Sequence, residues 1–348
     1  MTRRRWTAIL GLGLLVGCNA DGNREALADQ ARDEQTVTAA KALFQSRFDA
    51  FAAATQALRD AAPAPDADGW NARDDAAAVA SMRAAWLEAR AAYTSVEILA
   101  STRYPELHRR LDRDYDDLIA GSADTFSFDE HGVMGLQAVE RILWSDVIPA
   151  HVIDHEAPLE HYTAADFPRS QHEAQELKDE LLVHLEADAA TLRDGFRAAP
   201  IDANTAYSTT TLAIQEQLGQ LEEAGKGEGK SRYAGVSLEN LRGDVAATEA
   251  TYAVFRPWIL AKSTGAHTDE HVAKGFARLH VALAAASGDD LPLPPAGWPT
   301  SDPSGEMLAS PFGLLFAATR DAADPSTDGT LCFEMIEAAG LLGVTADY

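Results

Sequence analysis

The sequence predicts an all-α protein built from long antiparallel helices arranged in bundles. Apolar side chains recur at three-, four- and seven-residue steps over most of the chain, which is the period of a helix with one buried face. No stretch of useful length alternates between apolar and polar residues as a half-buried strand does. Hydrophobic residues make up 46% of the 348 residues, so the chain can bury a sizeable core.

The helices are predicted in chain order from their apolar stripes and from the residues that interrupt them. The first stripe consists of Val37, Phe44, Phe48, Phe51 and Leu58, and the proline-containing run 62–66 ends it. Further helices are expected at 74–101, 128–144, 166–198, 202–224, 237–260 and 268–287. Residues 288–311 carry six prolines and predict an extended connector, with two short helices near 306–322 and 328–342.

The charge balance is strongly acidic and excludes one class of partner. There are 54 Asp and Glu residues against 29 Lys and Arg residues, which gives a formal net charge of −25. A surface of this sign repels the phosphates of nucleic acids, so no nucleic-acid partner is expected. The same field attracts cations, either metal ions or basic partners.

The N-terminus predicts export. Three arginines at 3–5 precede an uncharged stretch, Trp6–Gly17, which is too short to span a bilayer and is typical of a signal peptide. We therefore expect residues 1–17 to be a signal peptide. The polar residues 18–33 are interpreted as a tether that precedes the folded domain.

The end of this signal resembles a bacterial lipobox, Leu15-Val16-Gly17-Cys18. The resemblance implies cleavage before Cys18, lipidation of that cysteine, and a membrane-anchored protein of the cell envelope that faces the periplasm. Asn19 is not the Asp that retains such lipoproteins at the inner membrane, so the outer membrane is preferred. An ordinary cleaved signal with a coincidental cysteine is the alternative.

Two predicted helices carry charged residues on faces that otherwise look buried. Trp86, Arg90, Tyr93 and Glu97 are spaced by four, three and four residues, so they share one helix face. Arg90 and Glu97 are then expected to point inward, about 10 Å apart along the axis. They form either an internal ion pair or part of a binding site.

Glu140 is the second charged residue on a buried stripe. It lies between Leu136 and Leu143, and Gln137 precedes it by one turn on the adjoining flank. A carboxyl group in such a place is a metal ligand, a hydrogen-bond anchor, or an acid with a raised pKa. A purely structural role stays open.

The segment Gly135-Leu136-Gln137-Ala138-Val139-Glu140, followed by Leu143-Trp144, resembles the Gly-x-His-x-x-Glu motif of the imelysin-like proteins. That family includes periplasmic components of bacterial iron uptake and proteins historically classed as peptidases. Four further segments resemble the family in order and spacing: Trp86 to Glu97, Gln215-Glu216, Lys226-Gly227-Glu228 with Arg232-Tyr233, and Phe255-Arg256-Pro257. The resemblance covers approximately residues 35–287.

The resemblance implies one imelysin-like domain over 34–348, with a polar pocket between helical halves at approximately 34–199 and 200–348. It also implies that the pocket binds a divalent or ferric metal ion. Gln137 stands at the position of the motif His, Glu140 at that of the motif Glu, and Glu216 at that of a later acidic ligand. Asp154 is a looser candidate. Because an amide oxygen is a weak, hard ligand compared with imidazole, Gln137 predicts a lower affinity for borderline metals.

Two other segments carry metal-ligand residue types. One contains His151, Asp154, His155, Glu156, Glu160 and His161, but Pro149 and Pro158 bracket it and favour an acidic loop. The other segment, His267-Thr268-Asp269-Glu270-His271, fits the inverted zincin pattern, although its acids also suit the start of a helix.

One further histidine lies outside both segments. His131 precedes Gln137 by six residues and reaches the pocket only if the chain bends there.

The sequence favours an exported, lipid-anchored imelysin-like binding protein for metal acquisition, with iron as the first candidate metal and envelope transport proteins as partners. It does not decide whether the protein is an enzyme. One alternative is a metallopeptidase that uses the motif pocket or His267, Glu270 and His271. The other is a scaffold or non-metal ligand-binding lipoprotein, in which Arg90, Glu97, Gln137 and Glu140 form only a hydrogen-bonded network.

Overall fold

The computed structural model describes residues 17–70, 73–113, 134–299 and 301–348, with side chains from residue 24 onward. Helices, turns and irregular connections make up this described part, and no strand occurs in it. The predicted all-α fold is therefore confirmed. None of the described helices has both the length and the apolar character needed to cross a bilayer. The predicted signal peptide, apart from the backbone of its last residue, and the side chain of Cys18 lie outside the described residues.

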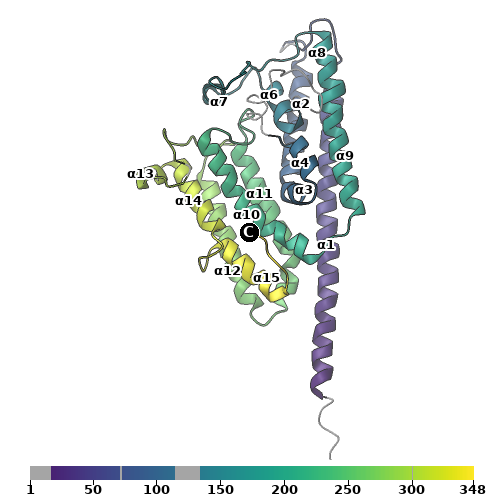
Figure 1. Cartoon of the computed structure of the whole chain (residues 1–348), viewed down its shortest axis with the longest axis vertical. Coiled ribbons are helices and arrows are strands. Elements are labelled where there is room, and N and C mark those ends of the chain that lie inside the picture. Colours follow the sequence, from purple (N-terminus) through teal and green to yellow (C-terminus); the bar gives the residue numbers. More distant parts are fainter. Residues whose placement is uncertain (1–16, 71–72, 114–133, 300) are drawn as a thin grey trace, which may run out of the picture.

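A long first helix, α1 (Gly17–Ala61), runs beside both halves of the protein (Figure 1). It contacts α2 and α9 of the first half and α10 and α11 of the second half. The predicted phenylalanine stripe lies on its buried face, where Phe48 and Phe51 are fully buried. The other elements of the first half are α2 (Ala76–Thr94), α3 (Glu97–Arg103), α4 (Pro105–Leu111), α6 (Gly135–Leu143), α7 (Ala150–Glu156), α8 (Gln171–Glu176), the π-helical segment η1 (Leu177–Leu182) and α9 (Val183–Ala198).

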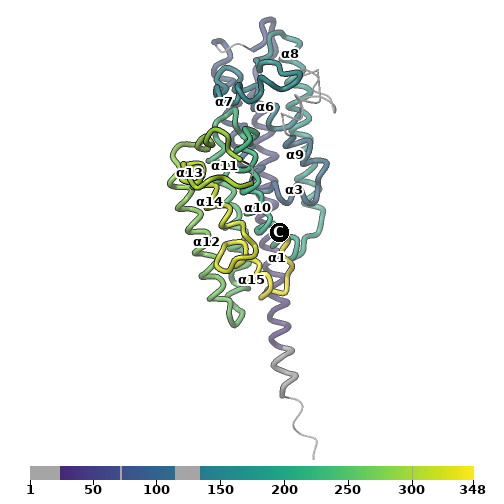
Figure 2. The backbone as a smooth tube through the Cα atoms, turned by 60° about the vertical axis from the view of Figure 1, so that its left-hand side comes forward, coloured from purple at the N-terminus to yellow at the C-terminus, as the bar shows by residue number. Residues whose placement is uncertain are grey.

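The second half is a bundle that lies alongside α1 in both views (Figures 1 and 2). Its elements are α10 (Ala203–Lys226), α11 (Ser237–Leu260), α12 (Gly265–Ala285), α13 (Gly305–Leu308), α14 (Pro311–Ala323) and α15 (Leu331–Leu342). Within it, α10 packs on α11 and α14, and α12 packs on α11 and α15. The buried apolar residues of both halves form one continuous core, so the halves belong to a single folded unit.

Arg47 on α1 ties the two halves together. Its guanidinium donates to the carbonyl oxygen of Ser95 at 3.2 Å in the first half. It also donates to Thr251 Oγ1 at 3.0 Å and to the carbonyl oxygen of Ala247 at 2.8 Å in the second half. Burial lowers the pKa of Arg47 to about 10, so the group stays charged at neutral pH.

The prediction of one continuous helix at 74–101 was wrong, because the chain breaks between α2 and α3 in front of Glu97. The first helix ends at Thr94, where the N–H of Val96 bonds to the carbonyl of Tyr93 at 2.9 Å, and Val96 has a non-helical φ of −126°. A new helix, α3, begins at Glu97. Because of this break, Glu97 Oε2 lies 3.8 Å from Arg90 Nη2, whereas in one continuous helix the two residues would be two turns apart.

Other boundaries also differ from the predictions. Residues 18–33, expected as a tether, have a helical backbone that belongs to α1. The helix predicted at 128–144 is described only as α6, since 128–133 lie outside the described residues. The connector ends earlier than expected, because Pro311 occupies the first turn of α14 behind the capping side chain of Ser310.

Gly135, the first residue of the motif, starts α6 in a conformation that favours glycine. Its φ is +84°, and a Cβ added there would lie 2.6 Å from the carbonyl oxygen of Arg110 and 2.7 Å from that of Leu111. Only glycine fits so close to another backbone at a positive φ. The motif glycine therefore places α6 directly against the end of α4.

Candidate functional site

Six charged residues gather between the two helical halves, and we call them the charge cluster. They are Arg90 on α2, Glu97 at the start of α3, Asp112 after α4, Glu140 on α6, Glu216 on α10 and Lys230 in the loop 227–236 that joins α10 to α11. The four from the first half are at most 8% exposed. The cluster lies where the resemblance to imelysin-like proteins predicted a polar pocket.

Lys230 is the centre of the cluster. Its Nζ lies 2.5 Å from Glu97 Oε1, 3.0 Å from Glu216 Oε1 and 3.7 Å from Asp112 Oδ2. Burial alone would lower the pKa of Lys230, but these three carboxylates raise it well above its usual value. The ammonium group is therefore a permanent internal cation at neutral pH.

Arg90 is the second cation and contacts the same acids from the other side. Its guanidinium lies 2.5 Å from Asp112 Oδ1 and 3.8 Å from Glu97 Oε2. Burial raises the pKa of Glu97 to about 7, although Lys230 opposes the shift. Burial acts in the same direction on Asp112, yet Arg90 and Lys230 outweigh it and hold the pKa of that carboxyl below its usual range. Asp112 is therefore ionised, and Glu97 is close to its titration midpoint at neutral pH.

Glu140 is fully buried and behaves differently from the other acids. The N–H of Ala234, in the loop that carries Lys230, donates to Glu140 Oε1 at 2.8 Å. Burial nevertheless raises the pKa of Glu140 to about 8, against the opposing effects of Arg90 and Arg232. Most of the Glu140 population is therefore neutral at pH 7.

Three buried carboxyl oxygens of the cluster lack a hydrogen-bond donor within the described part of the chain. They are Glu97 Oε2, Asp112 Oδ2 and Glu140 Oε2. Buried polar oxygens are nearly always satisfied, and those that are not often mark a site for water or an ion. Glu97 Oε2 lies 3.8 Å from Arg90 and Asp112 Oδ2 lies 3.7 Å from Lys230, so these two oxygens are spare acceptors beside the two cations.

Residues of positive φ and two hydrogen bonds from α11 set the conformation of the loop 227–236, which carries Lys230. Gly227 ends α10 with a φ of +95°, and Ser231 has a φ of 61°. Ser237 Oγ donates to the carbonyl oxygen of Lys230 at 2.5 Å, and Asn240 Nδ2 donates to Ser231 Oγ at 2.7 Å. The first turn of α11 thus fixes the loop that delivers the lysine into the cluster.

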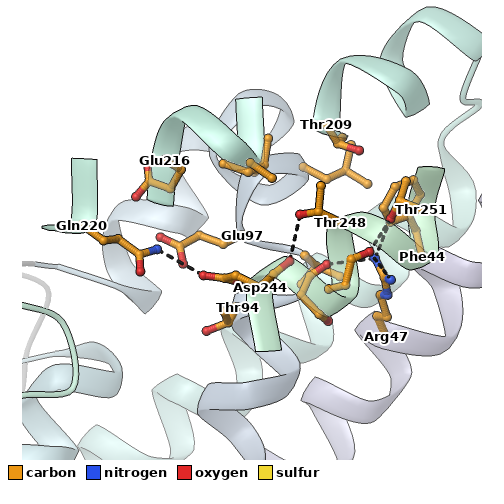
Figure 3. Close-up of a pocket in the computed structure, with 16 residues that line it drawn as sticks. Phe44, Arg47, Thr94, Glu97, Thr209, Glu216, Gln220, Asp244, Thr248 and Thr251 are labelled. Carbon is orange, nitrogen blue, oxygen red and sulfur yellow. Dashed lines mark hydrogen bonds between the residues drawn. The ribbon is translucent and has the colours of Figure 1, made fainter. Parts of the chain in front are cut away.

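A cavity of about 30 Å³, enough for one or two waters, adjoins the cluster between the halves (Figure 3). Figure 3 shows Glu97 between Glu216 and Asp244, with Gln220 bonded to Asp244 at its edge. Burial raises the pKa of Asp244 well above its usual value, and Glu97 adds to the shift. The cavity wall thus carries a further buried carboxyl group that resists ionisation beside Glu97.

The comparisons with known proteins agree with this architecture. The sequence model of the peptidase M75 family, described as imelysin, matches residues 28–311. The chain belongs to the imelysin family. A crystal structure of an imelysin-like protein from Psychrobacter arcticum 273-4 has the same fold, with a TM-score of 0.60 and 12% sequence identity over 92% of this chain and 98% of that one. No curated protein matches the chain.

The structure brings most of the residues singled out by the imelysin resemblance together. Arg90 pairs with Glu97, and Glu216 pairs with Lys230. Glu140 interacts electrostatically with Arg90. Gln137, at the position of the imelysin His, is 8% exposed and lies one turn before Glu140 on α6.

Asp154 is not brought to the cluster. It is exposed on α7 and lines a separate hollow of about 590 Å³ beside the end of α10 and the proline-rich connector. The acidic loop expected at 151–161 begins as a helix, because α7 spans Ala150–Glu156. The buried acid of this segment is Glu156, which accepts from Arg141 at 3.1 Å and from Arg232 at 3.2 Å. His131 lies outside the described residues.

Sequence reasoning missed Asp112 and Lys230, two of the six members of the cluster. Asp112 lies between the helices predicted at 74–101 and 128–144, where the sequence carries no motif. Lys230 has a signal that could have found it, because it ends the run Lys226-Gly227-Glu228-Gly229-Lys230, where glycines bring a backbone and its charges close to other elements.

The described residues of the cluster do not fit a permanently bound metal ion as they stand. No group of three or more His, Cys, Asp or Glu side chains in the described ranges is arranged to hold one. Lys230 already occupies the space between Glu97, Asp112 and Glu216, while Glu140 is mostly protonated. Metal binding at this site therefore requires Lys230 to move.

Glu140→Gln removes a carboxyl group that resists ionisation in the folded protein. In the unfolded chain the group ionises near its ordinary pKa of 4.5, whereas the folded protein keeps the proton up to about pH 8, so the group destabilises the fold increasingly over this range. Relative to wild type, the free energy of unfolding of Glu140→Gln should rise by on the order of a few kcal/mol from about pH 5 to about pH 8. Urea denaturation at several pH values measures this difference.

The matched control for this prediction is Glu88→Gln, which changes an exposed glutamate on α2. The difference in the free energy of unfolding between Glu88→Gln and the wild type should not depend on pH over the same range. A pH-independent difference for Glu140→Gln would contradict the assignment of a neutral, buried carboxyl group.

Proposed function

We propose that the protein is an exported, lipid-anchored binding protein of the imelysin family that serves metal acquisition, with iron as its first candidate cargo. The observation that carries this proposal is the charge cluster, in which carboxyl groups from both helical halves surround one small cation. Two of their buried oxygens, Glu97 Oε2 and Asp112 Oδ2, lack a hydrogen-bond donor within the described part of the chain. An arrangement of oxygen ligands that already holds an ammonium group is suited to a competing metal ion.

The cargo ion binds in exchange for Lys230. Glu97, Asp112 and Glu216 carry up to three negative charges, against two positive charges on Arg90 and Lys230. When a divalent or ferric ion takes the place of the ammonium group, the same acids balance its larger charge. The ammonium group leaves on the flexible four-carbon stem of the lysine side chain, while the loop backbone stays in place.

The available ligands favour a hard metal ion. Carboxylate and amide oxygens suit hard cations, whereas imidazole suits zinc, copper and nickel. With Gln137 in place of the imelysin His, the described pocket offers oxygen ligands and no imidazole from the motif. Ferric iron and hard divalent ions are therefore preferred as cargo over zinc.

The geometry gives less support to a peptidase. Glu270, the general base that the His267–His271 pattern would use, is exposed and bonds to Lys274 at 2.7 Å. His271 contacts Glu334 at 3.0 Å, and Glu334 lies on α15, outside the His267–His271 pattern. A binding role for the chain is consistent with a cluster that already holds a cation of its own, the ammonium group of Lys230.

The envelope location rests on the N-terminal sequence. The basic start, the short uncharged stretch and the lipobox-like end at Cys18 support export and lipidation, and Asn19 supports the outer membrane. An anchored binding protein of this kind would deliver its cargo to transport proteins of the envelope. The net charge of −25 favours cationic cargo at the protein surface as well.

Metal titration of the full-length protein tests the binding role. Calorimetry with ferric iron, buffered by a weak chelator, and with Mn²⁺ should show one site in the wild type. Glu216→Gln and Glu97→Gln should weaken binding roughly tenfold or more, since each removes a ligand. Lys230→Gln should strengthen binding, because the competing cation is gone. Gln137→His should raise the affinity for Zn²⁺, because it adds an imidazole.

Glu88→Gln is the control for these variants and should bind as the wild type does. Metal analysis of the same samples checks the stoichiometry. If the wild type and Lys230→Gln both bind no metal, or if Glu216→Gln and Glu97→Gln bind as tightly as the wild type, the metal-binding function is wrong.

Cys18→Ser tests the anchor separately. Without the thiol there is no acceptor for the lipid, so the variant should move from the membrane fraction to the soluble periplasmic fraction. Fractionation with radiolabelled fatty acid measures both the location and the modification, and Cys332→Ser, which changes the buried second cysteine, is the control. A wild-type protein that takes up no label would contradict lipidation.

A further inference from the structure

We propose that His267 and His271 form a second, separate metal site on the surface of α12, which binds a borderline divalent transition ion and is oriented by Glu334. The two histidines lie one helical turn apart, and their ring centroids are 4.3 Å from each other. Imidazoles at positions i and i+4 of a helix project from one face and can hold one ion between them. This site is independent of the charge cluster and of the function proposed for it.

Glu334 fixes the ring of His271 in the form that metal binding requires. Its Oε1 lies 3.0 Å from His271 Nδ1. An ionised carboxylate can only accept, so Nδ1 carries the proton and donates to it. The other ring nitrogen, Nε2, then bears the lone pair that a metal ion uses, as in carboxylate–histidine–metal arrangements.

Glu334 is itself held in place. It lies in the first turn of α15, its side chain is 8% exposed, and α15 packs against α12. The carboxylate therefore approaches His271 from the protein interior, while the side chain of His271 is 31% exposed. His267, in the first turn of α12, is exposed. The pair is thus open to solvent on one side and supported on the other.

The ligand set determines which ions bind. Two imidazoles favour Zn²⁺, Ni²⁺ and Cu²⁺, and water completes the coordination at an exposed position. Glu270 is adjacent but pairs with Lys274 at 2.7 Å, so it is not required as a ligand. This preference differs from that of the charge cluster, whose oxygen ligands suit hard ions.

The two sites are also far apart. Lys230 lies in the loop before α11, whereas His267 lies just after the turn that follows the same helix. With 24 residues, α11 is about 36 Å long, and the two sites lie toward its opposite ends. Binding at one site is therefore measurable without interference from the other.

The contact between His271 and Glu334 also has a purely structural explanation, which an experiment can distinguish from a metal site. The contact between His271 and Glu334 could serve only to join α12 to α15, in which case His267 has no part in it. His267→Ala is the discriminating variant, because it removes one metal ligand from an exposed position and leaves the His271–Glu334 contact intact.

The test is calorimetric titration of the full-length protein, without an affinity tag, with Zn²⁺ and with Ni²⁺. His267→Ala and His271→Ala should each weaken Zn²⁺ binding at this site at least about tenfold. Two controls, His280→Ala on the same helix and His151→Ala from the other i, i+4 histidine pair, should leave it unchanged. Glu216→Gln should also leave it unchanged, so failure here is separable from failure of the charge cluster.

Glu334→Gln tests the positioning role. It keeps an oxygen that accepts from His271 but lacks the negative charge, so Zn²⁺ affinity should fall by about 10–100-fold with unchanged stoichiometry. The proposal is overturned if Zn²⁺ binding is absent in the wild type or survives His267→Ala unchanged. If Zn²⁺ affinity is lost in His151→Ala instead, the ion sits on α7 and the proposed site is wrong. Unchanged affinity in Glu334→Gln overturns the role of Glu334.

Discussion

The contact between the ammonium group of Lys230 and the carboxylates of both helical halves is the interaction on which the site depends. Burying a carboxylate without a partner costs several kcal/mol of folding free energy. Glu97 and Asp112 can therefore be buried between the halves only if cations contact them. Arg90 supplies one cation from α2, and the loop before α11 supplies the other. Since Glu216 on α10 shares the same ammonium group, neutralising the acids also joins the two halves.

This constraint explains the protonation of the remaining acids. Two cations lie among these acids, Glu97 is left near its titration midpoint, Glu140 is mostly neutral, and burial raises the pKa of Asp244 well above its usual value. The interior thus stays close to electrical neutrality although five carboxyl groups line it. A cation of higher charge in place of Lys230 is the change that would allow more of these groups to ionise.

The sequence was sufficient to predict the fold class and the two charged faces that meet in the cluster. Periodic apolar stripes such as that of α1 follow directly from helix geometry, and Arg90, Glu97 and Glu140 stood out because they interrupt such stripes. The break at Val96 was not predictable, because no proline or glycine marks it and tertiary contacts decide it. Asp112 and Lys230 lie outside regular helices, where no periodicity indicates which way a side chain points.

The central claim is that a metal ion and Lys230 compete for the same carboxylates. A crystal structure of the protein soaked with iron, with anomalous data collected on both sides of the iron absorption edge, tests it most directly. We expect an anomalous peak between Glu97, Asp112 and Glu216, with the ammonium group of Lys230 turned out of the cluster. A cluster without a peak, in which Lys230 still contacts Glu97 and Glu216 at saturating iron, would contradict it.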